Sequence, residues 1–258
     1  MNYLLAFVKE RQLHIDLVHV FDIPITMSSS QFPRAVEGLI TERGDAVRDE
    51  LLLLRERIPD GHRGEIHVIY GVYPSTEINE LAEKLEVDLV VMGMREKYSI
   101  FDRLIGTVTA QTISKSNVPV LVIPQGATFK GIRKILFPTI MGVDDEFSEQ
   151  EEESLFKLFD FARFSGDTEV NFLHIQTKSA GRKSHIDVIF DDVPFKGFQY
   201  TRSYAEKVDE GLLEHLQKER TDLLAFYKPH RSFWERLYRS SLTRKLLFSS
   251  RIPILVFH

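Results

Sequence analysis

The stretch from residue 93 to residue 107 carries the residue types closest to ligand-binding chemistry. Gly93 ends an apolar run, and Gly106 and Thr107 stand where a helical pattern begins. Glycine lets a backbone come close to a ligand, and the free N–H groups at a helix N-terminus attract anions. The hydroxyls of Thr107 and Thr109 would add donors for phosphate oxygens. The spacing therefore indicates a phosphate site, and the alternative is an ordinary turn between a strand and a helix.

A basic and aromatic segment, residues 228–251, is a second candidate. It contains seven Lys and Arg residues and only one carboxylate, and Phe233, Trp234 and Tyr238 lie among them. Such a segment is able to bind an anion, an RNA strand or an acidic partner. Its apolar residues also recur at helical spacing, which favours a helix that packs on a sheet and leaves its arginines in water. The candidate anion or partner contacts are Lys228, Arg231 and Arg236.

Other polar clusters give weaker indications. The acidic stretch 144–153 would suit a metal or a partner, but a solvated loop leading into a helix is the simpler interpretation, because helix N-termini favour negative charge. His19 and His174 stand at similar places in two strand patterns, which favours shared packing over metal binding. The histidine spacing does not predict a metal site. No catalytic residue set is predicted, so we expect no enzyme, with a residual ATPase activity left open.

Composition limits the class of protein. The 258 residues include no cysteine and carry a net charge of -5. Disulfides, thiol catalysis and Cys-ligated metals are thereby excluded, and nucleic-acid binding over the whole surface is disfavoured. No apolar run reaches the roughly 18 residues that a membrane helix needs, and the start does not resemble a signal peptide. We expect a cytoplasmic protein without membrane contact.

The elements that would position these residues alternate between strands and helices. Helical patterns cover 35–58 and 75–86, and strands of β-branched residues lie around them. Because most strands are apolar throughout, the pattern predicts an α/β fold with doubly wound parallel sheets covered on both faces. The expected strands are 15–20, 65–70, 88–93, 118–124, 134–138, 168–175, 222–226 and 252–257.

The two halves of the chain are copies of one unit. Segment 88–124 aligns with 222–258 without a gap, and at the same offset 65–86 aligns with 199–220. The second copy opens with the strand 134–138, whereas the first copy begins inside the helix that should follow such a strand. The first copy therefore lacks a leading strand and its loop, roughly 25 residues by comparison. We interpret this as a truncated chain or a misassigned start; a natural variant would need something else to fill the gap.

With its strand and loop DLVVMGMREKYSIFDRLIGTVTAQTISKSNVPVLVIP and the KILFPT that opens the second copy, the chain resembles a universal stress protein of the tandem form. The resemblance implies two Rossmann-like domains of the adenine nucleotide alpha hydrolase-like type. The first, 1–126, lacks its N-terminal strand, and the second, 131–258, has a degenerate nucleotide loop. It also implies that the last strand of each repeat pairs with the other, and that a homodimer and an unknown protein partner are open possibilities.

Nucleotide-binding members of this family carry Gly-x2-Gly-x9-Gly-(Ser/Thr) around the phosphates of ATP. Glu96 replaces the second glycine here, and a carboxylate close to a phosphate costs several kcal/mol, roughly 4 at an effective dielectric constant of 20, unless Mg²⁺ bridges the charges. In the second repeat Tyr227 replaces the first glycine, His230 replaces the second, and Ile140 stands in place of an aspartate. The contacts that the resemblance implies are Val20, Met92, Gly93, Gly106, Thr107, Val108 and Thr109.

Three functions follow as expectations. The first is a non-enzymatic regulatory protein of the stress response with at most weak nucleotide binding in repeat one. The second is an ATP-binding protein or slow ATPase that uses Mg²⁺. The third is an interaction module that uses residues 228–251. No cofactor is certain, and ATP with Mg²⁺ is the one that the resemblance suggests.

Overall fold

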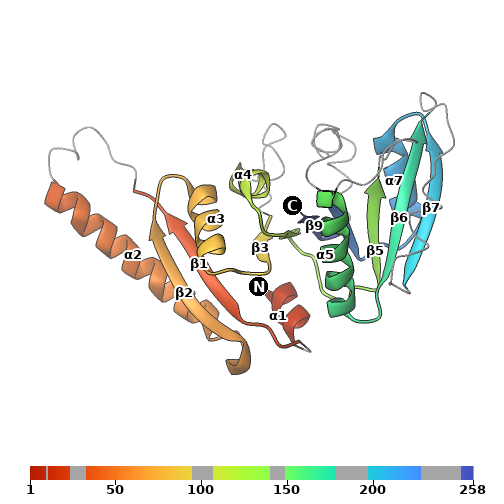
Figure 1. The fold of residues 1–258 in the computed structure, drawn as a ribbon. Helices are drawn as coiled ribbons and strands as arrows, with labels where there is room; N and C mark the ends of the chain where they lie inside the picture. Colours follow the sequence, from red (N-terminus) through yellow and green to blue (C-terminus); the bar gives the residue numbers. More distant parts are fainter. Residues whose placement is uncertain are drawn as a thin grey trace. The chain divides into compact units, whose positions relative to one another are not determined.

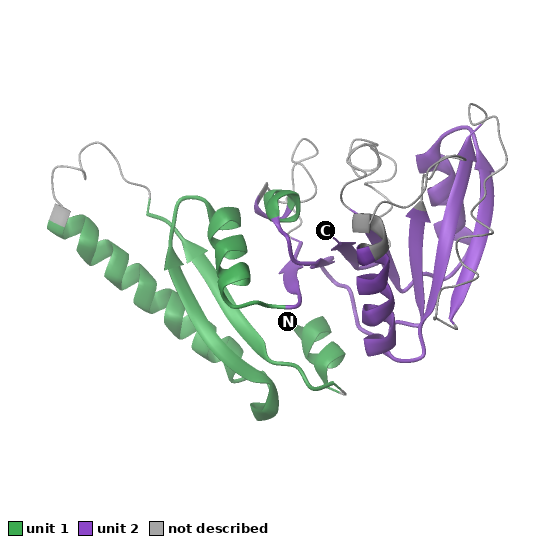
Figure 2. Cartoon of the chain, viewed as in Figure 1, with its two compact units in different colours: residues 1–87, 110–115 green, residues 88–109, 116–258 purple. Residues whose placement is uncertain are grey.

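The computed structural model describes residues 1–9, 11–23, 33–94, 107–139, 149–177, 197–227 and 251–257. These residues divide into two compact units, unit 1 with Met1–Val87 and Ala110–Lys115, and unit 2 with the remainder (Figure 2). Both units combine helices with strands (Figure 1). The expected α/β class with parallel sheets is confirmed.

Unit 1 holds a two-stranded parallel sheet, β1 (Ile15–Phe21) and β2 (Arg63–Tyr70). The long helix α2 (Pro33–Arg55) covers one face of it, where Val47 and Leu51 pack with Phe21. The helices α1 (Asn2–Val8) and α3 (Pro74–Lys84) also belong to this unit, together with most of α4 (Thr107–Lys115). Three side-chain hydrogen bonds join α3 to α4: Ser75 to Gln111, Asn79 to the carbonyl of Thr112, and Lys115 to Thr76.

Unit 2 is built on a seven-stranded sheet in the order β3-β4-β9-β8-β5-β6-β7. Neighbouring strands run parallel except β4 and β9, which pair antiparallel. The strand β5 therefore lies inside the sheet, between β6 and β8, and β3 lies at an edge. The bounds are β3 Val90–Gly93, β4 Val120–Ile123, β5 Lys134–Thr139, β6 Glu169–Thr177, β7 Phe198–Ala205, β8 Leu223–Tyr227 and β9 Ile254–Phe257.

Two helices cover opposite faces of this sheet near β6. On one face Phe159 of α5 (Glu149–Ser165) lies against Phe172, with ring centroids 6.1 Å apart. On the other face Gly211 of α7 (Val208–Lys218) approaches Ile175 so closely that an added Cβ would lie 2.7 Å from its Cγ2. Since side chains alternate along a strand, even-numbered residues of β6 face α5 and odd-numbered ones face α7. Buried residues therefore lie on both faces of this strand, Phe172 on one and Ile175 on the other.

The repeat predicted from the sequence agrees with these bounds. The alignment of the two copies takes α3 onto α7 and β4 onto β9, end to end. The structure also agrees with the predicted pairing of the two last strands, because Val120, Leu121 and Val122 lie opposite Val256, Leu255 and Ile254.

The two copies differ in one strand, β5, which is described only in the second copy. β5 joins β6 to β8, whereas β1 and β2 form a sheet of their own, apart from β3 and β4. Among the described residues, the first copy has no strand in the place of β5. Within the same residues, no helix is long and apolar enough to cross a membrane.

Candidate functional site

The predicted phosphate loop starts and ends at described residues of unit 2. Met92 and Gly93 are the last residues of β3, and Thr107, Val108 and Thr109 open α4. α4 lies between β3 and β4 in the chain, and these two strands are parallel, so this crossover helix begins toward the carboxyl end of β3. That end of a parallel sheet is where open α/β folds bind their ligands. Both ends of the predicted loop therefore lie at the carboxyl-end side of β3.

The surroundings of Gly93 and of α4 fit an anion in two respects. A Cβ built on Gly93 would meet nothing within 4 Å, so there is space beside the backbone at the end of β3. The first turn of α4 contains no acidic residue. Thr109 departs from the prediction of an open donor, because it is only 5% exposed. Val108 is half-buried.

The remaining predicted contacts belong to other parts of the chain. Val20, predicted to lie against adenine, is a half-buried residue of β1 in unit 1. Gly106 and Glu96 lie outside the described residues. The candidate contacts of the basic segment, Lys228, Arg231 and Arg236, also lie outside them.

The second repeat presents a different strand end at the same place. Tyr227, which aligns with Gly93 in the repeat, ends β8 and is only 7% exposed. A buried tyrosine side chain thus stands in the second copy where the first copy has a glycine with open space beside it. His230 lies outside the described residues.

The acidic stretch 144–153 and the strand histidines were the other polar groups considered from the sequence. α5 begins at Glu149, so four of the glutamates of the acidic stretch lie in its first turns, as the favourable charge at a helix N-terminus allows. His174 of β6 is 7% exposed, and burial, reinforced by the charge of Arg202, lowers its pKa. The described residues contain no group of three His, Asp or Glu side chains that could hold a metal ion.

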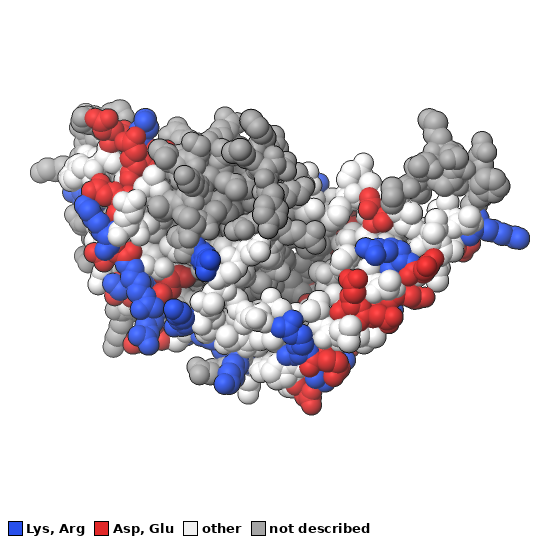
Figure 3. All heavy atoms as spheres, turned by 180° about the vertical axis from the view of Figure 1, so that it is seen from behind, with Lys and Arg blue, Asp and Glu red and all other residues white. Residues whose placement is uncertain are grey.

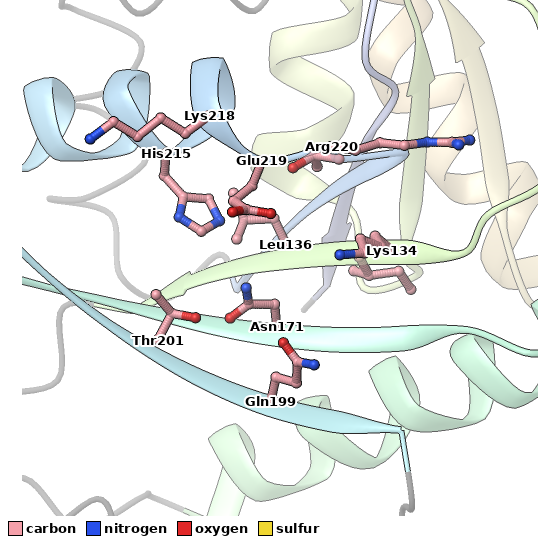
Figure 4. Close-up of a pocket in the computed structure, with 11 residues that line it drawn as sticks. Lys134, Leu136, Asn171, Gln199, Thr201, His215, Lys218, Glu219 and Arg220 are labelled. Carbon is pink, nitrogen blue, oxygen red and sulfur yellow. The ribbon is translucent and has the colours of Figure 1, made fainter.

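A polar pocket in unit 2 was not predicted. It has a volume of about 260 Å³ and lies on the α7 face of the sheet, beneath the last turn of that helix (Figure 4). Asn171 points into it from β6, and the oxygen of its amide is buried without a hydrogen-bond partner in the described structure. The other polar side chains that converge on it are those of Lys134, Gln199, Thr201, His215 and Glu219.

The charges at this pocket are balanced. Burial lowers the pKa of His215, the nearby carboxylate of Glu219 opposes this change, and the ammonium group of Lys134 adds to it. His215 is therefore neutral at neutral pH. Lys218 and Arg220 extend away from the pocket and pair with Glu214 and Asp222. The pocket thus offers both donors and acceptors, which suits a small polar molecule better than a polyanion. Its residues come from four elements, so no local motif in the sequence could have revealed it.

The described surface has charges of both signs. On the face seen in Figure 3, acidic and basic side chains are interspersed. Several pair locally, such as Arg63 with Glu56 and Asp60. Interspersed charges give no strong field of one sign over these residues.

Comparison with known proteins agrees with the fold. The strand order and parallel pairing define a Rossmann-like α/β protein. A family model described as the universal stress protein family matches residues 1–124. Universal stress protein G of Shigella flexneri is 32% identical over 110 residues, which are 42% of this chain and 76% of that protein. The chain belongs to the universal stress protein family.

Two further comparisons extend this result. Universal stress protein MJ0577 of Methanocaldococcus jannaschii is 28% identical over 117 residues, 45% of this chain and 68% of that protein. The crystal structure of a universal stress protein from Archaeoglobus fulgidus DSM 4304 aligns with a TM-score of 0.62 over 99% of this chain and 89% of that one. Their sequence identity is 14%, so this likeness concerns the fold alone.

Proposed function

We propose that this chain is a tandem universal stress protein with a non-enzymatic, regulatory role in the stress response. Its repeats span 1–126 and 131–258. Nucleotide binding is weak and belongs to repeat one. The protein acts by binding partners, either as a monomer with paired repeats or as a homodimer.

The observation that carries the proposal is the contrast between Gly93 and Tyr227. Gly93 leaves open space at the end of β3, whereas Tyr227 is buried at the end of β8. One repeat thus keeps room for a phosphate at its strand end and the other has filled it. Glu96 follows Gly93 by three residues, and its charge opposes a phosphate in the remaining site.

Thermal unfolding with Mg·ATP tests this proposal. A ligand at 100 times its dissociation constant stabilises a fold by about 2.7 kcal/mol, which raises the melting temperature by several degrees. We expect millimolar Mg·ATP to shift the wild type by at most about one degree and Glu96→Gly by several degrees, because this change removes the repelling carboxylate. His230→Gly makes the equivalent change in repeat two and should give no new shift.

Two results would contradict the proposal in different ways. A shift of several degrees in the wild type that Thr107→Ala removes, while Ser241→Ala in repeat two does not, would favour the alternative of an ATP-binding stress protein. The absence of any shift in Glu96→Gly would show that the loop has lost phosphate binding for another reason. If the double change Arg231→Glu and Arg236→Glu abolishes binding of an anion or partner protein, the segment 228–251 is the functional surface.

A further inference from the structure

The polar pocket beneath α7 has two charged groups that the rest of the described structure does not use. Lys134 and Glu219 both line it, and their side chains are turned toward it (Figure 4). Neither side chain makes a hydrogen bond or ion pair with the residues that the structure describes. The two other charged residues at the pocket, Lys218 and Arg220, are in ion pairs with carboxylates outside it. Among these residues the pocket therefore keeps one unpaired positive charge and one unpaired negative charge.

The pocket lies where α7 diverges from close contact with the sheet. At Gly211 the helix packs tightly on Ile175 of β6. Because residues four apart share a face of a helix, His215 lies on the same face as Gly211, one turn further along. Glu219, directly after the helix, follows at the same spacing. His215 and Glu219 therefore cover the pocket from the helix side.

The polar groups on this side are specific to the second copy. The offset between the copies takes Leu81 onto His215 and Leu85 onto Glu219. Leucine is the residue expected where a crossover helix only packs on its sheet. The second copy has an imidazole and a carboxylate at these two places, and both border a hollow. A packing role alone does not explain this exchange of leucine for polar residues.

The strand side of the pocket presents two neighbouring amides. Asn171 of β6 lies directly beside Gln199 of β7, and Thr201 follows on the same face two residues further along β7. On the other side of Asn171 lies Leu136, which is 2% exposed and gives the pocket an apolar floor. The amide oxygen of Asn171 is buried without a hydrogen-bond partner among the described residues. A hydrogen bond from a ligand would offset the lost hydration of this amide.

Charge and size limit the class of ligand. The last carbonyl groups of α7 carry partial negative charge, and with Glu219 they disfavour a polyanion such as a nucleotide. Lys134 disfavours a ligand that is only cationic. His215 is neutral at neutral pH because burial lowers its pKa, so it leaves this balance unchanged. The volume of about 260 Å³ is below the roughly 300–1,000 Å³ of pockets for drug-sized ligands. A small zwitterion satisfies all of these conditions.

We propose that this pocket binds a free amino acid with an uncharged polar side chain. Lys134 binds its carboxylate, Glu219 binds its ammonium group, and the amides of Asn171 and Gln199 bind its side chain. The pocket lies toward the amino ends of β5, β6 and β7, where Lys134 opens β5. The nucleotide loop of this copy would instead follow Tyr227, at the carboxyl end of β8. The amino-acid site is therefore distinct from the nucleotide site of the fold.

L-Glutamine and three related molecules test the proposal on the full chain. Proton–nitrogen correlation spectra follow the side-chain amides of Asn171 and Gln199 during each titration. We expect L-glutamine to shift both signals saturably, with one dissociation constant. N-acetyl-L-glutamine lacks the ammonium charge and L-glutamine amide lacks the carboxylate, so each should bind about tenfold more weakly. L-Leucine, a zwitterion of similar size without a polar side chain, should also bind about tenfold more weakly.

Two variants assign each charge of the ligand to its partner. Lys134→Met should weaken L-glutamine binding and abolish the difference between L-glutamine and its amide. Glu219→Gln should abolish the difference between L-glutamine and its N-acetyl derivative. Lys157→Met and Glu153→Gln make the same changes at an ion pair of α5, on the opposite face of the sheet, and should leave all affinities unchanged. Unchanged melting temperatures would verify the fold of each variant.

The proposal is wrong if L-glutamine shifts neither amide at tens of millimolar. It is also wrong if the two derivatives bind as tightly as L-glutamine, or if either pocket variant weakens all ligands equally, because the pocket would then not distinguish their charges. Inorganic phosphate that binds more tightly than L-glutamine would show an anion site instead. These results are distinct from those of the ATP experiment, which depend on the loop after Gly93.

Discussion

Leu121 and Leu255 lie directly opposite each other where β4 and β9 pair antiparallel. The two residues are equivalent in the repeat, and both are 0% exposed. The same strand of each copy thus pairs with its counterpart through equivalent residues, as in the interface of a twofold dimer. This relationship makes the seven-stranded sheet continuous across the two copies.

We expect Leu121 and Leu255 to be energetically coupled. Truncation of either to alanine should cost about 3 kcal/mol, since each is a fully buried leucine. Because they are cross-strand neighbours, the double variant should differ from the sum of the two single variants by at least about 0.5 kcal/mol. Urea unfolding of the four proteins in this cycle measures the coupling. If the two single losses of unfolding free energy add up to the loss in the double variant, the two side chains are not energetically coupled.

Asp88 and Asp222 should differ in their contribution to stability although the repeat makes them equivalent. Asp222 accepts two backbone amides and the Nε–H of Arg220, at 3.0 Å. Asp222→Ala should therefore lower the free energy of unfolding by about 2 kcal/mol. Asp88→Ala should change it by less than about 0.5 kcal/mol, because Asp88 is exposed and makes no hydrogen bond or ion pair with the residues that the structure describes. Equal losses in urea unfolding would mean that Asp88 already holds another part of the chain.

Much of the fold could be predicted from the sequence because the repeat transfers information between copies. The segment FQYTRSYA is a weak strand signal and is not among the expected strands, yet the offset between the copies takes the strand pattern 65–70 onto 199–204, inside β7 (Phe198–Ala205). The end of β3 at Gly93 and the start of α4 at Thr107 also follow from local signals, an apolar run and a Gly-Thr pair. These are features that neighbouring residues determine.

The parts that could not be predicted depend on distant residues. Leu136, Asn171 and Gln199, which line the pocket beneath α7, lie side by side in the sheet. Their proximity depends on the register between three strands, which the sequence of no single strand determines. The burial of Thr109 depends in the same way on tertiary packing. Thr109 therefore matched the pattern of a phosphate donor although its side chain is almost enclosed.

Two glycines should respond in opposite directions to replacement by alanine. Both lie in helices, Gly38 in α2 and Gly211 in α7. A Cβ on Gly38 meets nothing within 4 Å, so Gly38→Ala should stabilise the fold by about 0.5–1 kcal/mol through the higher helix propensity of alanine. A Cβ on Gly211 would lie 3.0 Å from the Cβ of Ala205 and closer still to Ile175. Gly211→Ala should cost about 1–3 kcal/mol. The melting temperatures of both variants test these two expectations. A lower melting temperature for Gly38→Ala than for the wild type would contradict the expected stabilisation.

Stability should fall on mild acidification because two histidines resist protonation in the fold. Burial lowers the pKa of His174 below its ordinary value of 6.5, and burial also lowers the pKa of His215. Between the lowered pKa and 6.5 the unfolded chain binds protons that the native chain does not. Stability therefore rises with pH in this window and is constant above it, as far as these two residues contribute.

The measurement is the free energy of unfolding in urea between pH 8 and pH 5.5, above the range in which most carboxylates titrate. The wild type should lose stability as the pH falls through 6.5. His174→Leu should reduce this loss, because leucine fills the buried position without a titrating group, and the further change His215→Gln should reduce it again. The two histidines are buried in different places: His174 lies on the face of β6 that α5 covers, and His215 borders the polar pocket. A wild type whose stability is equal at pH 8 and pH 6 would show that both rings accept protons in the native state as readily as in the unfolded chain.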